Sequence, residues 1–349
     1  MLVSTFPPRI DGIARYAEQL AKSRDGAREM VRVGLSGSAA DLVFRLDGNL
    51  RPLRIIWATR SADEVVLMWH PDFYISGRAW SRVGAYLALG AVLRVRNVKV
   101  VVHEPDSLVP RKRGIHRRLA AGVERAAQKW CWRSPAQLLF HSEKERADFA
   151  KRFARAPAVR VGRVINHGAH FQPYAHASRD EARRRLGLHR GRLIFLCIGF
   201  LGRHKGFDRA IQAFRRLPRD SADLYVVGSA LYDSAEIRDH INELRVLAAS
   251  VPGVTVIERF LEDAEFDLWV RAADALLAPY RSAASSGVVA RAKLLGTAVV
   301  ASRVGGIPEQ LGPDGIVIES DEELFAAVAR LAQRQIAGTI ETIRGSGGP

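Results

Sequence analysis

The chain has 349 residues, a length that accommodates two domains of ordinary size. A hydrophobic content of 48% is enough for a core in each domain and excludes a mainly disordered chain. The formal net charge of +16 lies almost wholly in the first half: Met1–Gln172 holds 30 Lys and Arg against 15 Asp and Glu, and the remainder holds 23 against 22. This asymmetry predicts an anionic surface or ligand for the first half, the alternative being a merely solvated basic face.

The cysteines and the apolar runs indicate the compartment. Cys131 and Cys197 lie inside apolar runs, which argues against a disulfide framework or a Cys-rich metal site and is typical of a reducing compartment. No apolar run is as long as a transmembrane helix requires, which is about 18 residues. The first residues, MLVSTFPP, lack the basic and apolar regions of a signal peptide. We therefore expect a cytoplasmic protein, either free or peripheral at the inner face of the plasma membrane.

Helix-like and strand-like patterns alternate along the first half. After a helical pattern at Gly12–Lys22, short apolar runs at Val65–His70 and Val98–Glu104 have the length of strands. A second helical pattern, Arg118–Trp130, leads to a third apolar run at Gln137–Ser142.

The second half repeats the alternation after a polar segment between Phe171 and Arg192. Apolar strands separated by helices predict parallel sheets covered on both faces. We expect two Rossmann-like, doubly wound α/β domains at 1–172 and 190–320, then a C-terminal helix and a disordered tail at 321–349. The strand-like runs of this half are 193–200, 222–229, 254–260, 273–280 and 297–302, and the helical patterns are 207–217, 236–250, 265–272 and 286–296.

Two segments of the second half have features of phosphate-binding loops. In such sheets ligands lie outside the carboxyl ends of the strands, so a cleft between the domains is the expected site. Arg203 and Lys205 lie between a strand and a helix in IGFLGRHKGFDRAIQAF, where a guanidinium fork and an ammonium suit a phosphate group. The alternative is an ordinary solvated turn.

The second such segment is SSGVVARAKLLG. Ser285 or Ser286 can cap the helix, whose first amides have no internal partner, and Gly287 carries no side chain to block a phosphate. Gly305–Gly306, after the next strand, provides a second close backbone approach. Taken alone, this segment is also consistent with nothing more than a well-capped helix.

Eight motifs follow one another along the chain: FPPRIDGIARYAEQLA, VVHEPD, FHSEKERADF, VINHGAH, GFLGRHKGFDRAIQAF, LYVVGS, VTVIERF and SSGVVARAKLLGTAVVASRVGGIPE. Taken in this order, the motifs resemble the family 4 (group 1) retaining glycosyltransferases of the GT-B fold. The resemblance runs from Ser4 to about Leu311. It implies an N-terminal domain for a lipid-linked or glycan acceptor and a C-terminal domain for a UDP- or GDP-linked sugar. It also implies hexosyl transfer with retention at the anomeric carbon, without a metal or other cofactor.

The resemblance also implies roles for single residues. Gly12 would face the donor phosphates, His103 the sugar and Glu104 the acceptor, and Gly228 and Phe260 would border the base. A merely packed histidine is the alternative for His103, and packing is what we expect of His141 and His167. The implied set is His103, Lys205 and Arg203 for catalysis, and Gly12, Glu104, Gly228, Phe260, Ser285, Ser286, Gly287 and Val288 for substrate binding.

The chain departs from the family at its paired glutamates. Ala283 and Arg291 stand at those positions, and Phe200 follows Gly199 where the family has arginine. Three explanations remain open. In the first, backbone groups and Lys205 hold the donor sugar. In the second, the donor is unusual and Arg291 binds an acidic group on it. In the third, the protein is a non-catalytic partner of another transferase.

The basic segment Arg111–Arg133 carries eight Lys and Arg, one Glu, and the tryptophans Trp130 and Trp132. This composition predicts contact with an anionic membrane surface, the alternative being a solvated helix with its tryptophans in the core. We expect no nucleic-acid partner, because no binding motif accompanies the basic half. A nucleotide-sugar epimerase is disfavoured, because its proton transfers need paired carboxylates.

Overall fold

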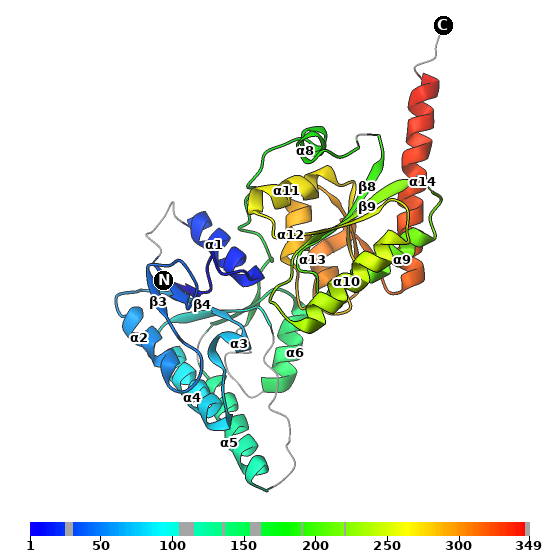
Figure 1. Cartoon of the computed structure of the whole chain (residues 1–349). Helices are drawn as coiled ribbons and strands as arrows, with labels where there is room; N and C mark the ends of the chain where they lie inside the picture. Colours follow the sequence, from blue (N-terminus) through cyan, green and yellow to red (C-terminus); the bar gives the residue numbers. More distant parts are fainter. Residues whose placement is uncertain are drawn as a thin grey trace. The chain divides into compact units, whose positions relative to one another are not determined.

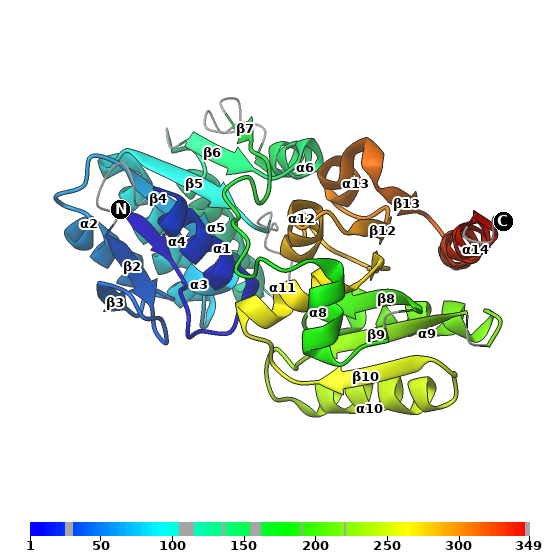
Figure 2. The ribbon, with the colours of Figure 1, turned by 90° about the horizontal axis from the view of Figure 1, so that it is seen from above.

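The computed structural model describes residues 1–24, 31–104, 115–134, 137–153, 162–189, 191–219 and 221–345. The chain divides into two compact units, Met1–Phe171 and Gln172–Pro349. Each unit is a parallel sheet covered by helices (Figures 1 and 2), which confirms two Rossmann-like α/β domains. Among the described residues, no helix has both the length and the apolar character needed to cross a membrane.

The sheet of unit 1 has the order β3-β2-β1-β4-β5-β6-β7, with every pairing parallel. The three expected strands are confirmed as β4, β5 and β6, and the two expected helices as α1 and α5. The strands are β1 Leu2–Ser4, β2 Arg32–Leu35, β3 Leu42–Phe44, β4 Val65–Trp69, β5 Val98–Val102, β6 Gln137–Phe140 and β7 Arg163–Val164. The helices are α1 Gly12–Arg24, α2 Arg54–Ala58, α3 Pro71–Tyr74, α4 Ala79–Val95, α5 Ile115–Cys131 and α6 Glu143–Phe153.

The sheet of unit 2 has the order β10-β9-β8-β11-β12-β13, again parallel throughout. All five expected strands and all four expected helices are confirmed, and the polar segment before them contains α8. The strands are β8 Leu193–Ile198, β9 Ala222–Gly228, β10 Val254–Glu258, β11 Ala275–Ala278, β12 Ala298–Ser302 and β13 Ile316–Ile318. The helices are α8 Arg179–Leu186, η2 Arg203–Lys205, α9 Phe207–Arg215, α10 Ala235–Ala249, α11 Asp263–Ala272, α12 Gly287–Leu294, α13 Ile307–Leu311 and α14 Asp321–Gly345.

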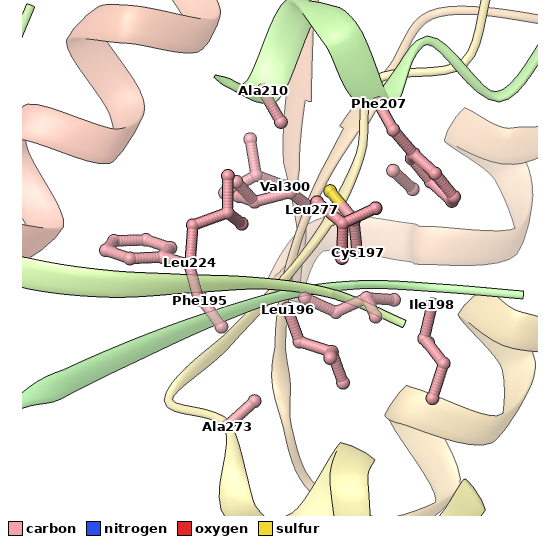
Figure 3. Packing of buried hydrophobic residues seen from close by; sticks show 14 of the residues in the cluster. Phe195, Leu196, Cys197, Ile198, Phe207, Ala210, Leu224, Ala273, Leu277 and Val300 are labelled. Carbon is pink, nitrogen blue, oxygen red and sulfur yellow. The ribbon is translucent and has the colours of Figure 1, made fainter. Parts of the chain in front are cut away.

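The core of unit 2 explains why the sequence of β8 is apolar at every position. All six of its side chains are buried, because helices cover both faces of the sheet. Figure 3 shows Cys197 on the side of Phe207 from α9, and Leu196 on the opposite side with Ala273. Burial raises the pKa of the Cys197 thiol, so this cysteine behaves as a small apolar residue. The packed sheet fixes the ends of its strands, from which the candidate site is built.

Candidate functional site

The start of α12 is an open helix N-terminus. Ser286 is buried and caps the helix, its Oγ accepting a hydrogen bond from the amide of Val289 at 3.2 Å. The amides of Gly287 and Val288 have no acceptor within the described part of the chain, and Gly287 is exposed. The helix start therefore offers two N–H groups without an acceptor among the described residues, together with the positive end of the helix dipole, where the sequence predicts a phosphate. Ser285, directly before the cap, is half-buried.

Gln310 of α13 fixes the cap, and the sequence did not predict this residue. Its Oε1 accepts from the Ser286 amide at 3.0 Å, and its Nε2 donates to the Ser286 carbonyl at 2.6 Å. The glycine pair after β12 supports the same loop. Gly305 has a φ of +52°, and a Cβ there would lie 1.9 Å from the carbonyl oxygen of Ala283. The close backbone approach at Gly305 is therefore made to the loop of Ala283 within the chain itself.

Lys205 lies near the start of α12, and the side chain of Tyr280 lies between the two. The Lys205 Nζ is 4.0 Å from the centroid of the Tyr280 ring, and the Tyr280 hydroxyl is 3.4 Å from Ser286 Oγ. Lys205 forms no ion pair with any carboxylate of the described residues. Gly206 follows with a φ of +63°, and a Cβ there would lie 2.1 Å from the carbonyl oxygen of Pro279. Only glycine lets the loop approach the end of β11 this closely.

Arg203, the other cation of the expected pair, has different surroundings. Its guanidinium pairs with Glu243 of α10 at 2.8 Å, with both side chains exposed. It lines a groove of about 770 Å³ between α9 and α10. Arg281 donates to the Arg203 carbonyl at 3.0 Å and grips Asp208 through two hydrogen bonds. Solvent screens an ion pair this exposed, so the pair contributes little to stability, but it already occupies the Arg203 guanidinium.

The expected base-binding edge lies at the carboxyl ends of β8, β9 and β10. A Cβ at Gly228 would lie 1.7 Å from the Gly199 carbonyl oxygen, and the Gly228 carbonyl accepts from the Arg259 amide at 2.7 Å. Gly228 is thus required by strand packing. Phe260, just after β10, is 39% exposed. Val288 lies against Gly199, which brings the start of α12 to the same edge.

In unit 1, four histidines surround Tyr16 of α1. The ring of Tyr16 lies 4.7 Å from that of His103, 5.3 Å from His141, 5.2 Å from His167 and 4.4 Å from His170. His141 and His167 are buried, as expected of packed side chains. Among the described residues, both nitrogens of His141 and the Nδ1 of His167 have no hydrogen-bond partner. His103 and His141 follow β5 and β6, so the cluster lies at the carboxyl edge of the sheet.

His103, His141 and His167 are held in the neutral form. Burial, with the charge of neighbouring histidines, lowers the pKa of His103 and His141 well below the ordinary value and that of His167 to about 3. His103 keeps a partly exposed surface, and its Nε2 is 3.2 Å from the Sδ of Met68. A neutral imidazole at this edge can hydrogen-bond a hydroxyl group but brings no positive charge to it.

A pH dependence of stability follows for unit 1. Because these pKa values are lowered on folding, the unfolded chain binds more protons below the ordinary value of about 6.5. We expect the contribution of His103, His141 and His167 to the free energy of unfolding to be constant above that pH and to fall as the pH drops from it towards 3. Urea midpoints between pH 8 and 5 measure this. His141→Leu should flatten the slope and the exposed His116→Leu should not; equal slopes in all three proteins would contradict the prediction.

Glu104 pairs with His70, a residue that the sequence analysis did not single out. Glu104 Oε2 lies 2.9 Å from His70 Nε2. Burial opposes the charged imidazole, but the hydrogen bond and charge of Glu104 outweigh it and raise the pKa of His70. The same hydrogen bond lowers the pKa of Glu104, which remains largely exposed. Part of the signal was present in the sequence, because each residue is the last of an apolar strand-like run; the structure adds that β4 and β5 are neighbours.

Gly12 opens α1 without any structural need for glycine. The cap is Asp11, whose Oδ1 accepts from the Ala14 amide at 2.6 Å and from the Thr5 hydroxyl at 3.0 Å. A Cβ at Gly12 would meet no atom within 4 Å, and Gly12 is exposed. The space left by the missing side chain is therefore free for a ligand to occupy.

Arg291, which stands at one glutamate position of the family, is bound inside unit 2. Its Nε lies 2.6 Å from the Oδ1 of Asp267, and the two side chains are 8% and 0% exposed. The other oxygen of Asp267 accepts from the amides of Tyr174 and Ala175 at 2.6 and 3.2 Å. This internal pairing disfavours the explanation in which Arg291 meets an acidic donor group. Ala283 is half-buried, with its carbonyl against the Gly305 loop.

The basic segment lies only partly within the described residues, since residues 111–114 fall outside them. Trp132 belongs to the core, with its ring 4.9 Å from that of Trp69, so the expectation of a membrane-facing tryptophan is wrong for this residue. Trp130 is 37% exposed and lies under the Arg94 guanidinium at 3.9 Å. Within the described ranges, no group of three or more His, Cys, Asp or Glu side chains is placed to hold a metal ion.

Comparison with known proteins adds to this geometry. Residues 192–334 match the family model of the glycosyl transferases group 1. The chain is 29% identical over 187 residues to a D-inositol 3-phosphate glycosyltransferase of Geodermatophilus obscurus, and 30% identical over 175 residues to one of Catenulispora acidiphila. These matches cover 50% and 48% of this chain. They span only 41% and 42% of the two relatives, so the chain covers less than half of their length.

The fold has close structural counterparts. The crystal structure of HepE from Anabaena in complex with UDP and glucose superposes with a TM-score of 0.66 at 15% identity, covering 98% of this chain and 90% of that protein. The fold of the chain is thus GT-B, and the greater part of unit 2 carries the sequence pattern of the glycosyl transferases group 1.

Proposed function

We propose that the protein transfers a sugar from a UDP- or GDP-linked donor to a lipid-linked or glycan acceptor, with retention at the anomeric carbon and without a metal ion. The observation that carries the proposal is the cluster at the start of α12. There the amides of Gly287 and Val288 lie beside Ser286, and Tyr280 lies next to both Ser286 and the ammonium of Lys205. In the described part of the chain, the two amides have no acceptor and the ammonium has no carboxylate partner.

The chemistry of sugar transfer suits this cluster. Cleavage of the bond to the anomeric carbon leaves a nucleoside diphosphate, on which negative charge develops. Fixed N–H groups and a cation aimed at that charge stabilise the transition state, because they need no reorganisation during the reaction. A cation and a helix N-terminus supply the charge compensation that a metal ion would otherwise give.

Turnover of a panel of sugar nucleotides tests the proposal. We expect release of UDP or GDP with one donor, unchanged rates in the presence of a chelator, and a product whose anomeric configuration by NMR equals that of the donor. Inversion would refute retention, and loss of activity with the chelator would refute metal independence.

A non-catalytic partner of another transferase is the second candidate. The observation that favours it is the absence of carboxylates at 283 and 291, where Arg291 is instead used in the core. Binding of a nucleoside diphosphate without turnover of any donor, alone or with acceptor extracts, would support this candidate over the enzyme.

Gly12 offers a test of donor contact from unit 1. Because a Cβ at this position meets no atom, Gly12→Ala should leave the melting temperature unchanged or slightly higher. If donor phosphates approach here, the same change should lower kcat/KM about tenfold. Steady-state kinetics and thermal unfolding of the two proteins measure both effects, and unchanged kinetics would exclude contact at Gly12.

We also propose that α5 contacts an anionic membrane surface. Its residues Ile115, Leu119 and Val123 follow one another at helical spacing and are 72%, 65% and 41% exposed, and Trp80 of the adjacent α4 is 67% exposed. Arginines 117 and 118 are exposed on the same helix. An apolar stripe flanked by cations is typical of helices that lie in the membrane interface.

Flotation with vesicles tests this surface. We expect more protein to float with vesicles containing phosphatidylglycerol than with neutral phosphatidylcholine, because each cation near an anionic leaflet contributes about 1 kcal/mol. Leu119→Asp should reduce the bound fraction at least about fivefold, whereas Leu231→Asp, an exposed leucine of unit 2, should not. Equal flotation with both lipids would contradict the proposal.

A further inference from the structure

Tyr280 occupies a fixed place between Lys205 and the start of α12. The residue is 1% exposed and lies two positions after the end of β11, so the core holds its ring. The carbonyl of the preceding Pro279 accepts a hydrogen bond from Arg209 at 2.8 Å and lies against Gly206. These contacts fix the backbone just before Tyr280 and just after Lys205.

The ring of Tyr280 holds the ammonium without neutralising it. The 4.0 Å between Nζ and the ring centroid is a cation–π contact, in which the electron-rich face of the ring attracts the charge. A carboxylate in the same place would cancel the field of Lys205 at a phosphate, as Glu243 does for Arg203. An aromatic ring restricts the position of the cation and leaves its charge available.

The hydroxyl of Tyr280 points to the other half of the cluster. It lies 3.4 Å from Ser286 Oγ, the atom that caps α12. One buried side chain is therefore in contact with the cation and adjacent to the helix cap. The distance between these two groups, which an anion would have to bridge, is set by the core of unit 2.

We propose that Tyr280 is a positioning residue for a diphosphate, holding the ammonium of Lys205 in register with the free amides at the start of α12. The inference rests on the proposed function, because it takes the anion to be the diphosphate of the donor. Tyr280 need not touch the ligand; it acts through Lys205.

Calorimetric titration of the full chain with UDP and GDP tests this role. Tyr280→Leu removes the ring and should weaken binding about fivefold to thirtyfold, whereas Tyr280→Phe keeps the ring and should bind within about threefold of the wild type. In a Lys205→Met background, Tyr280→Leu should have no further effect on affinity. A purely structural role would lower affinity equally in both backgrounds.

A second series covers the case in which Tyr280→Leu does not fold. Phenylalanine carrying one to five fluorine atoms, incorporated at position 280, keeps the ring shape while removing its negative face. Affinity should then decrease stepwise with the number of fluorines at a constant melting temperature. An affinity independent of fluorination, or an equal loss with Tyr280→Leu in the Lys205→Met background, overturns the inference. Absence of UDP and GDP binding by the wild type overturns the proposed function instead.

Discussion

Replacement of Lys205 by methionine is expected to lower kcat about 100-fold to 1,000-fold, the largest effect on activity that the structure predicts. The reason is that Tyr280 holds the ammonium of Lys205 next to the cap of α12, and no carboxylate partner of Lys205 is found among the described residues. The developing charge of the leaving diphosphate would lose this fixed cation. Steady-state kinetics with the preferred donor measure the effect.

Arg203→Met is the matched comparison. Its guanidinium is already paired with Glu243 at 2.8 Å, so we expect a smaller loss than for Lys205. Lys205→Arg, which keeps the charge, should retain more activity than Lys205→Met. If Lys205→Met stays within threefold of the wild type, the ammonium is not part of the reaction, and the α12 cluster loses its proposed role.

Disruption of the buried pair between Asp267 and Arg291 is expected to cause the largest loss of stability. Asp267→Ala leaves a buried guanidinium without its carboxylate and the amides of Tyr174 and Ala175 without their acceptor. We expect the free energy of unfolding of unit 2 to fall by about 3–5 kcal/mol, because an unpaired buried charge keeps its full desolvation cost. Urea unfolding followed by tryptophan fluorescence, analysed as separate transitions for the two units, measures the change.

Two control proteins isolate the ion pair. Asp267→Asn combined with Arg291→Met removes both charges but keeps an acceptor for the two amides, so it should recover most of the lost stability. Arg303→Met breaks an exposed pair with Glu319 at 2.6 Å and should change stability by less than about 1 kcal/mol. A loss no larger for Asp267→Ala than for Arg303→Met would show that the buried pair is not stabilising.

The sequence was sufficient for most of the fold because the relevant patterns are local. The run at 193–198 is apolar throughout, and both of its faces are covered in the structure. β2, β3, β7 and β13 were not predicted, since they have only two to four residues and too few positions to show a period. β7 in particular has exposed residues and pairs only through its backbone.

By itself, the sequence determined the two α/β units, a helix start capped by Ser285 or Ser286, and a loop carrying Arg203 and Lys205, because strand length, helix period and capping depend on neighbouring residues. Only the tertiary structure decided which cation lies beside that helix. Lys205 meets the ring of Tyr280, whereas Arg203 meets Glu243, and both partners are remote in the chain. The tertiary structure likewise decided that the side chain of Arg291 is buried and pairs with Asp267. Side-chain partners of this kind are set by how strands and helices pack, and no local pattern records that packing.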